Sequence, residues 1–204
     1  MLKAYYQISK YSSNNKLIIK GRKKISRSFV SAFIKHLYCV FYYSNTYSIA
    51  DTLGTLRTVQ YDALPLCMAP SGGIVISYPY TNSVGTQGQN FGIVLGSGTA
   101  AVIPTDDNLQ TKINHGTAAG EIEYLGHIFP KDVTTSGSDA SFTIERLFLN
   151  SSGGDVTINE MGLYNASQTG DVYIYCFIRD LVSPAVVVAN GEYLKVTYTI
   201  QVTC

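Results

Sequence analysis

Charged residues are scarce in this sequence of 204 residues. They make up 14% of the chain, against about 25% in an average globular protein, while hydrophobic residues make up 46%. This balance excludes a disordered chain and a helical protein rich in surface ion pairs. Beyond the first fifty residues Glu and Lys are few, and Tyr, Gly, Thr and Val favour strands and turns, so an all-β fold is expected. The length suits one domain, or one domain with an additional arm.

The first fifty residues contain no Asp or Glu. They hold nine of the fifteen Lys and Arg residues, a net charge of +9, whereas residues 51–204 hold six cations and fourteen acids, a net charge of −8. Such an asymmetry indicates that the basic part has a separate task. Composition leaves three kinds of partner open: nucleic acid, an acidic surface, and the acidic body of a neighbouring copy.

The sequence also lacks a membrane-spanning run and a regular cysteine pattern. The most apolar stretch, 28–43, has sixteen residues with Lys35 and His36 in its middle, which is too short and too polar for a bilayer span of about 20 apolar residues. No membrane contact is therefore expected. The cysteines show no CxxC pair and no zinc-ligand spacing, which favours separate thiols in a reducing compartment over a metal site or a disulfide framework. They are Cys39, Cys67, Cys176 and Cys204.

The N-terminal part divides into an arm and a helix. Residues 1–24 are polar and basic with one short β-like run, 17–19, and predict an arm. After them the apolar residues recur at the spacing of an amphipathic helix, at Ile25, Phe29, Phe33, Leu37 and Phe41. Two interpretations stay open: this helix packs on its own domain, or it docks into another subunit. The predicted domains are an arm with helix over 1–48 and a β domain over 49–204.

After residue 48 the sequence predicts short strands separated by turn residues. The last strand, 193–203, is the clearest, because five apolar residues from Leu194 to Val202 alternate with polar ones. Two connections, 151–155 and the dipeptide Asn190-Gly191, favour antiparallel hairpins, the second through a type I′ turn. Together these features predict an antiparallel β-sandwich of jelly-roll type. The other expected strands are 73–78, 91–95, 122–129, 141–149, 156–164, 172–178 and 185–188.

No grouping of residues points to catalysis. The segment Gly96 to Ala101 has the outline of a dinucleotide-binding loop, but no helix pattern follows it. The three histidines are far apart in the sequence, so no metal site is expected. One pair of acids, Glu121 and Glu123, alternates onto a single strand face and leaves a glycosidase as a lesser hypothesis. We therefore expect no catalytic residue, no cofactor and no metal, and a protein that is not an enzyme.

A series of motifs runs through the second half of the chain: GSGT at 96–99, TDDNL at 105–109, FTIERLF at 142–148, INEMGLY at 158–164, FIRD at 177–180 and a final hairpin over 184–200. Together they resemble a family of virion structural proteins of tailed phages and related viruses, over about residues 50–203. A strand similar to INEMGLY also occurs in phage tail-fibre and collar proteins. Met161 stands there where Ile is usual, an exchange that a core tolerates. The resemblance implies a β domain of the virion and brings no catalytic residue with it.

We therefore predict a viral structural protein that assembles in the host cytoplasm into or onto the virion, as a capsid, neck or tail component. A basic arm on an acidic body suits contacts between copies by charge complementarity, and aromatic residues are enriched in interface cores. The expected partners are other copies of the chain and other virion proteins. The predicted assembly residues are Lys20, Arg22, Lys23, Lys24 and Arg27 in the arm and Phe29, Phe33, Leu37 and Phe41 on the helix.

Two other functions stay open. The first is a carbohydrate- or receptor-binding module of a virion fibre, which would use Tyr78, Tyr80 and Asn82 beside a loop. The second is a capsid subunit whose basic arm neutralises the phosphates of packaged nucleic acid, a contact that weakens steeply with salt. The assembly hypothesis and the nucleic-acid hypothesis depend on the same lysines, so the sequence does not separate them.

Overall fold

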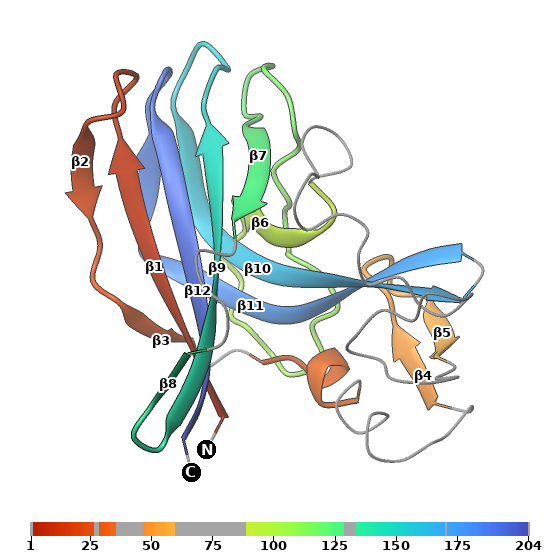
Figure 1. Cartoon of the computed structure of the whole chain (residues 1–204). Coiled ribbons are helices and arrows are strands. Elements are labelled where there is room, and N and C mark those ends of the chain that lie inside the picture. The colour runs from red at the N-terminus through yellow and green to blue at the C-terminus, as the bar shows by residue number, and fades with distance from the viewer. Residues whose placement is uncertain are drawn as a thin grey trace.

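The computed structural model describes residues 2–26, 29–35, 47–59, 89–128, 134–169 and 171–203. It consists of antiparallel sheets with one short helix over 31–35, which confirms the predicted all-β class (Figure 1). The strands are β1 (Leu2–Tyr11), β2 (Leu17–Lys20), β3 (Lys24–Ser26), β4 (Tyr47–Ala50), β5 (Leu56–Val59), β6 (Gly92–Gly96), β7 (Glu123–Ile128), β8 (Thr134–Ser136), β9 (Asp139–Leu149), β10 (Val156–Thr169), β11 (Asp171–Val188) and β12 (Tyr193–Thr203).

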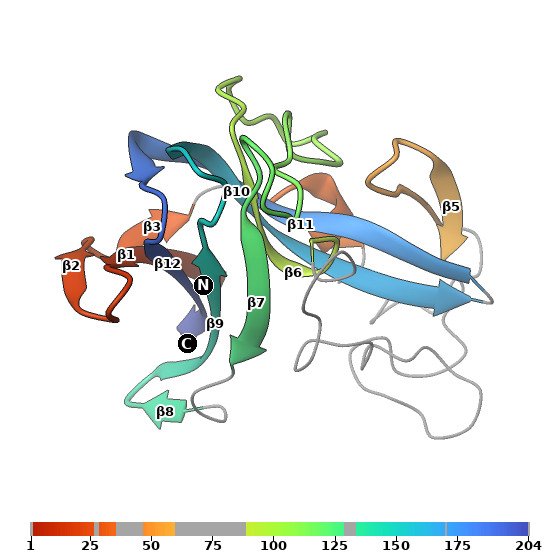
Figure 2. The ribbon, with the colours of Figure 1, turned by 90° about the horizontal axis from the view of Figure 1, so that it is seen from above.

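Two sheets pack against each other, and a separate strand pair lies beside them. The large, seven-stranded sheet has the order β2-β1-β12-β9-β7, with β3 also on β1 and β8 also on β9. The small sheet has the order β11-β10-β6, and β4 pairs with β5. All of these pairings are antiparallel. Seen from above, β10 and β11 run past the large sheet toward β5 (Figure 2).

The core lies between the two sheets, and β12 shows how the sequence fills it. Leu194, Val196 and Tyr198 are fully buried, as the alternation along this strand predicts. Val202, on the same face near the end of the strand, is 45% exposed. The Tyr198 hydroxyl donates a hydrogen bond to Asp180 Oδ2 of β11 at 2.9 Å. The sheets are therefore joined by a buried polar contact as well as by apolar packing.

The chain from Asp139 to Thr203 forms one long antiparallel ribbon that is folded over. Its inner half pairs β10 with β11 as far as Val156 and Val188, which are partners. Its outer half pairs β9 with β12, starting at Leu149 and Tyr193. Between the two halves both strands of the ribbon cross together from the small sheet to the large sheet.

The two predicted hairpin turns lie where the ribbon crosses. Residues 151–155 connect β9 to β10, and residues 189–192 connect β11 to β12, and in each case the two strands belong to different sheets. The prediction that these connections close hairpins is therefore wrong, because each strand pairs with the other half of the ribbon. A type I′ turn needs positive φ at both central residues, but of Asn190 and Gly191 only the glycine has one, at 82°.

Asn150 holds the two crossing connections together. Its side chain is fully buried, and Nδ2 donates to the carbonyl oxygens of Gly154 and Val188, each at 2.7 Å. Its backbone N–H donates to the Glu192 carbonyl at 3.0 Å, and its own carbonyl accepts from the Gly191 N–H at 2.7 Å. A buried amide needs such partners to offset its desolvation, and here they tie both strands at the crossing.

The segment predicted as an arm lies in the large sheet instead. β1 pairs with β12 along its whole length, and β2 and β3 both pair with β1. Ala4 and Tyr6 are buried, because apolar residues alternate along β1 with polar ones such as Lys3 and Gln7. Residues 2–26 are thus part of the β domain, and the predicted boundary at residue 48 does not separate them from its sheet.

The helix predicted over 25–41 is shorter where the structure describes it. Ile25 lies in β3, whose pairing with β1 takes the place of the first helical turn. The helix itself covers 31–35. The Phe33 ring lies 4.5 Å from the Phe29 ring and 5.6 Å from the Phe177 ring of β11, between ring centres. These two predicted helix residues therefore pack on their own domain.

Candidate functional site

Four of the predicted arm residues lie at one edge of the large sheet. Lys20 is in β2, Lys24 is in β3, and Arg22 and Lys23 lie between these strands, all with exposed side chains. Lys24 Nζ donates to a backbone carbonyl of β11, and Lys23 Nζ lies 4.4 Å from the centre of a tyrosine ring in β1. Two of the four cations thus contact their own domain. The remaining predicted assembly residues, Arg27, Leu37 and Phe41, lie outside the described residues.

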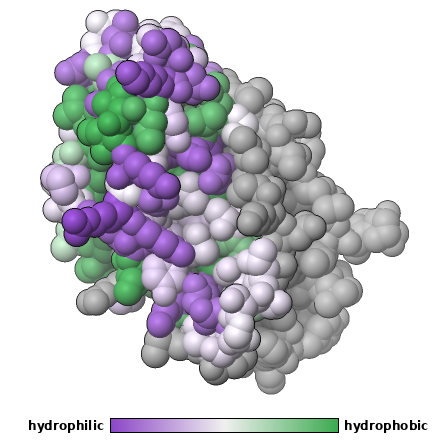
Figure 3. Space-filling view, turned by 60° about the vertical axis from the view of Figure 1, so that its left-hand side comes forward, coloured by the Kyte–Doolittle hydropathy of each residue, from purple (hydrophilic) through white to green (hydrophobic). Residues whose placement is uncertain are grey.

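The same edge carries exposed apolar side chains. Leu17, Ile18 and Ile19 of β2 are 47%, 45% and 56% exposed, and Lys16 and Lys20 flank them. Among the described strands β2 pairs with β1 alone, so the backbone groups on its other side face outward. Apolar and hydrophilic side chains lie next to each other on this side of the molecule (Figure 3). We call residues 16–20 the β2 edge.

The opposite edge of the large sheet ends in β7 and carries acids. Glu123 is the first residue of β7, pairs with Leu149 of β9 and is partly exposed. Glu121 lies just before this strand, and its Oε2 accepts a hydrogen bond from the Ala118 N–H at 3.1 Å, which holds a local turn. The two acids of the glycosidase hypothesis therefore lie at the end of the large sheet, where the outward N–H groups of Ile122 and Tyr124 donate within the chain, to residues 114 and 115. We call β7 together with Glu121 the β7 edge.

Three of the sequence motifs meet in one buried ion-pair network. Glu160, from INEMGLY, is fully buried, and its Oε2 lies 2.8 Å from Arg179 Nε of FIRD. Arg179 Nη1 lies 2.8 Å from Asp106 Oδ2 of TDDNL, and Nη2 donates to the Ala100 carbonyl at 3.0 Å. Burial acts to lower the pKa of Arg179, but its hydrogen bonds to Asp106 and Glu160 raise that pKa above its usual value. The guanidinium therefore stays charged.

Glu160 also fastens the loop between β6 and β7. Its carboxylate oxygens accept hydrogen bonds from the N–H groups of Gly98, Gln110 and Thr111 at 3.1, 3.1 and 2.8 Å. A Cβ atom at Gly98 would lie 2.4 Å from Glu160 Oε1, so the glycine of GSGT leaves the room that the carboxylate needs. Because its charged groups are paired within the protein, the network is a structural lock that fixes residues 97–111 on β10.

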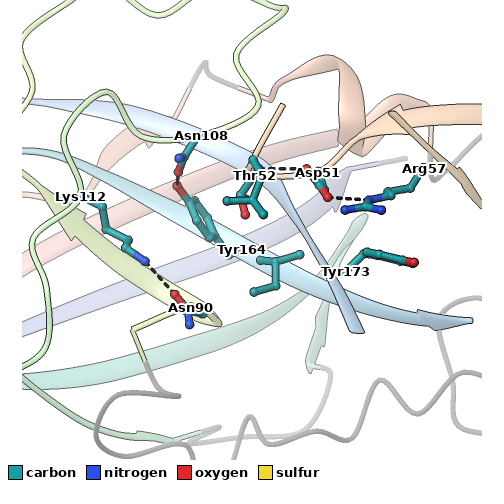
Figure 4. A pocket seen from close by; sticks show the side chains of 10 residues that line it. Asp51, Thr52, Arg57, Asn90, Asn108, Lys112, Tyr164 and Tyr173 are labelled. Atoms are coloured by element: carbon teal, nitrogen blue, oxygen red, sulfur yellow. Dashed lines mark hydrogen bonds and ion pairs between the residues drawn. The ribbon is translucent and has the colours of Figure 1, made fainter. Parts of the chain in front are cut away.

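A pocket of about 330 Å³ lies where the β4–β5 hairpin, the β6–β7 loop and strands β10 and β11 meet (Figure 4). The Thr52 N–H donates to the Ile174 carbonyl at 2.8 Å, which ties the hairpin to β11. Both residues line the pocket. Its other walls carry charged, amide and aromatic side chains, so the pocket differs in character from the apolar core.

Lys112 is the cation of the pocket that forms no ion pair within the described part of the chain. Its Nζ donates to Asn90 Oδ1 at 2.7 Å, and none of the ion pairs among the described residues involves it. Burial lowers the pKa of this ammonium group, because a charge is poorly solvated there. The group is half-buried and is directed along the pocket wall toward Asn90 (Figure 4).

At the other end of the pocket Asp51 and Arg57 neutralise each other. Arg57 Nε lies 2.8 Å from Asp51 Oδ2, and the guanidinium carbon lies 4.3 Å from the centre of the Tyr173 ring. Burial acts to raise the pKa of Asp51, but hydrogen bonds from Arg57 and from the N–H groups of Thr55 and Leu53 hold it below its usual value. This pair is therefore ionised and already complete.

Tyr164 and Asn108 complete the polar lining. The Tyr164 hydroxyl donates to Asn108 Oδ1 and accepts from the Leu109 N–H at 2.7 Å. Burial raises the pKa of Tyr164, so its phenol stays neutral. Asn108 belongs to the TDDNL motif, which thus contributes one residue to the buried network and another to the pocket.

The sequence prediction includes none of the pocket residues, because they come from segments that are far apart in the chain. Two of the sequence motifs contribute to the pocket: TDDNL contains Asn108, and INEMGLY ends in Tyr164. The residues of the carbohydrate hypothesis, Tyr78, Tyr80 and Asn82, lie outside the described residues. Of the cysteines, Cys176 is described, as a free thiol whose pKa is raised by burial.

The described part of the chain holds no group of three or more His, Cys, Asp or Glu side chains that could hold a metal ion. Within the same ranges no helix is both long enough and apolar enough to cross a membrane. The chain matches no family model, no curated protein and no solved structure.

Proposed function

We propose that this chain is a virion structural protein that assembles, in the host cytoplasm, by joining the β2 edge of one copy to the β7 edge of the next. The observation that carries the proposal is the exposed run of Leu17, Ile18 and Ile19 on an edge strand. The virion context rests on the resemblance of the motifs from GSGT to the final hairpin. Jelly rolls of two sheets occur in viral capsid domains, and the ribbon folded across two sheets supports that architecture here.

An edge strand with exposed apolar residues favours pairing with another chain. Its outward N–H and C=O groups are a template for a further strand, and burial of apolar surface stabilises such a contact by about 25 cal/mol per Å². A lysine within an edge strand discourages pairing, but Lys20 stands at the end of the apolar run of β2 rather than inside it. A lysine in this place favours an acidic partner.

Complementary side-chain charges, rather than free backbone groups, select the β7 edge as that partner. Lys16 and Lys20 flank the apolar run, and Glu121 and Glu123 lie at the β7 edge. Antiparallel pairing of two β2 edges would instead bring the lysines of both copies together, and like charges on opposed strands repel. A contact between two different edges is heterologous, so it repeats from copy to copy and forms a closed ring or an open filament. Either arrangement suits the proposed capsid, neck or tail component.

Charge-reversal variants test this arrangement. Size-exclusion chromatography with light scattering measures the assembly of the wild-type chain, of Lys16→Glu/Lys20→Glu and of Glu123→Lys. We expect the wild-type chain to form oligomers that dissociate as salt rises, and each variant alone to remain monomeric. An equimolar mixture of the two variants brings opposite charges together again at the joined edges, so oligomers should return.

A matched control changes the net charge equally at another place. Lys3→Glu/Lys35→Glu leaves the β2 edge intact and should assemble like the wild-type chain. A mixture that stays monomeric, while each variant keeps the circular dichroism of the wild-type chain, contradicts the proposed contact. Oligomers that form only with added DNA favour the alternative of a capsid subunit whose cations bind packaged nucleic acid.

A further inference from the structure

The pocket beside Lys112 retains one positive charge. Three charged side chains line it, Lys112, Arg57 and Asp51, and the last two pair with each other at 2.8 Å. The hydrogen-bond partner of Lys112 is the neutral amide of Asn90, in a place where burial lowers the pKa of the ammonium group. A bound anion would stabilise the charged form, so the ligand that suits this site is negatively charged.

The uncharged polar groups of the pocket add hydrogen-bond donors. Asn90 Oδ1 accepts from Lys112, and Asn108 Oδ1 accepts from Tyr164. No hydrogen bond donated by the Nδ2 group of either amide occurs among the described residues, so these two groups and Lys112 Nζ are three donors in the lining of the pocket. A ligand with many acceptor oxygens matches this set, and a sugar that carries a carboxylate has them.

Apolar groups form the remaining walls. Tyr173 and Ile174, which are partly exposed, line the pocket, and the buried Tyr164 closes it. The apolar body of Tyr173 suits the C–H groups of a sugar ring. The volume of about 330 Å³ lies at the lower end of the range for small-molecule sites, about 300–1,000 Å³. One or two sugar units are the appropriate size.

We propose that this pocket binds a carboxylate-bearing sugar, such as a uronic or sialic acid unit, with its carboxylate at Lys112. A phosphate group would favour the planar fork of an arginine or several converging N–H groups, but Arg57 is already held by Asp51. The inference goes beyond the assembly proposal, since no pocket residue lies on the β2 edge or the β7 edge.

Calorimetric titration of the full chain with glucuronate and with glucose tests the role of the charge. The two sugars differ only at C6, where glucuronate has a carboxylate and glucose a hydroxymethyl group. N-acetylneuraminate is the second acidic probe. We expect at least one of the two acids to bind at least ten-fold more tightly than glucose.

Two variants remove the positive charge in different ways. Lys112→Met deletes the ammonium group, and Asn90→Asp places a carboxylate beside it; both should abolish the preference for the acid. The control Lys195→Met removes a cation paired with Glu145 in the large sheet and should keep the preference. The proposal is overturned if neither acid binds the wild-type chain, if glucose binds as tightly, or if both pocket variants retain the preference.

The same titration on Lys16→Glu/Lys20→Glu separates this proposal from the assembly proposal. We expect the acid to bind that variant with the affinity of the wild-type chain, whether or not the wild-type chain assembles. Loss of binding in this variant would place the ligand at the β2 edge and overturn the assignment to the pocket.

Discussion

The β6–β7 loop contacts β10 in two neighbouring places that differ in character. At Glu160 it covers a network in which one guanidinium meets two carboxylates and the loop N–H groups fill the remaining acceptor positions. Near Tyr164, on the same face of β10, it supplies Asn108 and Lys112 to a pocket in which the cation has an amide as its partner. Asp106 of this loop thus pairs with Arg179 and stabilises the fold. Lys112 of the same loop forms no ion pair among the described residues and is the cation of the proposed ligand site.

The largest effect is expected from Glu160→Ala. The substitution removes the acceptor of Arg179 Nε and of the Gly98 N–H in a buried place, and that of the Gln110 and Thr111 N–H groups in a partly buried one. Removal of one partner of a buried ion pair costs about 3–5 kcal/mol, so we expect the free energy of unfolding to fall by that amount. Urea denaturation followed by circular dichroism measures it.

Glu145→Ala is the matched control for this substitution. It removes a carboxylate from an ion pair with Lys195 whose side chains are 20% and 30% exposed, and such pairs contribute about 0–1 kcal/mol. If the free energy of unfolding falls equally in both alanine variants, the buried Glu160 network does not hold the β6–β7 loop as described.

Gly98→Ala tests how closely the loop approaches the Glu160 carboxylate. The new Cβ would lie 2.4 Å from Glu160 Oε1, and overpacking of this kind destabilises a fold by about 1–3 kcal/mol. In a Glu160→Ala background the obstructing carboxylate is gone, so the same substitution should cost less. A double-mutant cycle by urea denaturation gives the coupling, and additive values would show that the loop does not rest on Glu160.

The ion pair of Lys10 and Glu192, with Nζ and Oε2 2.9 Å apart, should contribute less to stability than the Glu160 network does. Burial acts to raise the pKa of Glu192, but hydrogen bonds from Lys10 and the Ala189 N–H hold it below its usual value. Its stabilisation is complete above the pKa of the unfolded chain, about 4.3, and is lost as the pH falls through the lower pKa of the folded chain.

We therefore expect Glu192→Gln to lower the free energy of unfolding at neutral pH by less than about 1 kcal/mol. In strong acid, where both forms of the side chain are neutral, the variant and the wild-type chain should be equally stable. Thermal melts over a series of pH values measure the difference, and a difference that grows toward acid would contradict the lowered pKa.

The smallest change in stability is expected from Lys112→Met. The substitution removes a half-buried ammonium group whose pKa is lowered by burial, and breaks one hydrogen bond to an amide. The lost hydrogen bond costs about 0.5–1.5 kcal/mol, but removal of a charge that burial disfavours offsets part of this cost, so we expect the free energy of unfolding to change by about 0.5 kcal/mol. Urea denaturation measures the change. A loss of stability as large as that of Glu160→Ala would show that Lys112 has a structural role like that of Glu160.

Local alternation explains which parts of the fold could be predicted from the sequence. It predicts the strands of the ribbon and the buried face of β12, since alternation depends on neighbouring residues alone. β1 has the same alternation at Ala4 and Tyr6, but the charge of the first fifty residues favours an arm. Pairing with β12 overrides this preference, as tertiary context commonly does for strands.

The network, the pocket and the crossing of the ribbon depend on distant contacts. Glu160 and Arg179 meet because of the register in which β10 and β11 pair, which shifts between Leu163 and Tyr164, and register is not a property of either strand alone. The turn residues at 151–155 likewise indicate that the chain changes direction but not to which sheet the next strand belongs. The motifs contain the residues of the network, but nothing in the sequence indicates that these residues contact one another in the fold.

The folded ribbon also determines the order in which the two sheets of this protein form. Thr169 and Asp171, which are two residues apart in the sequence, are partners. Each further pair along the ribbon closes a loop that is only slightly longer. Pairing can therefore spread along the ribbon at a small entropic cost per step. Leu2, in contrast, pairs with Val202, which the ribosome adds two hundred residues later. β1 therefore remains without its main partner during synthesis, and the large sheet is the last part of the molecule to be completed.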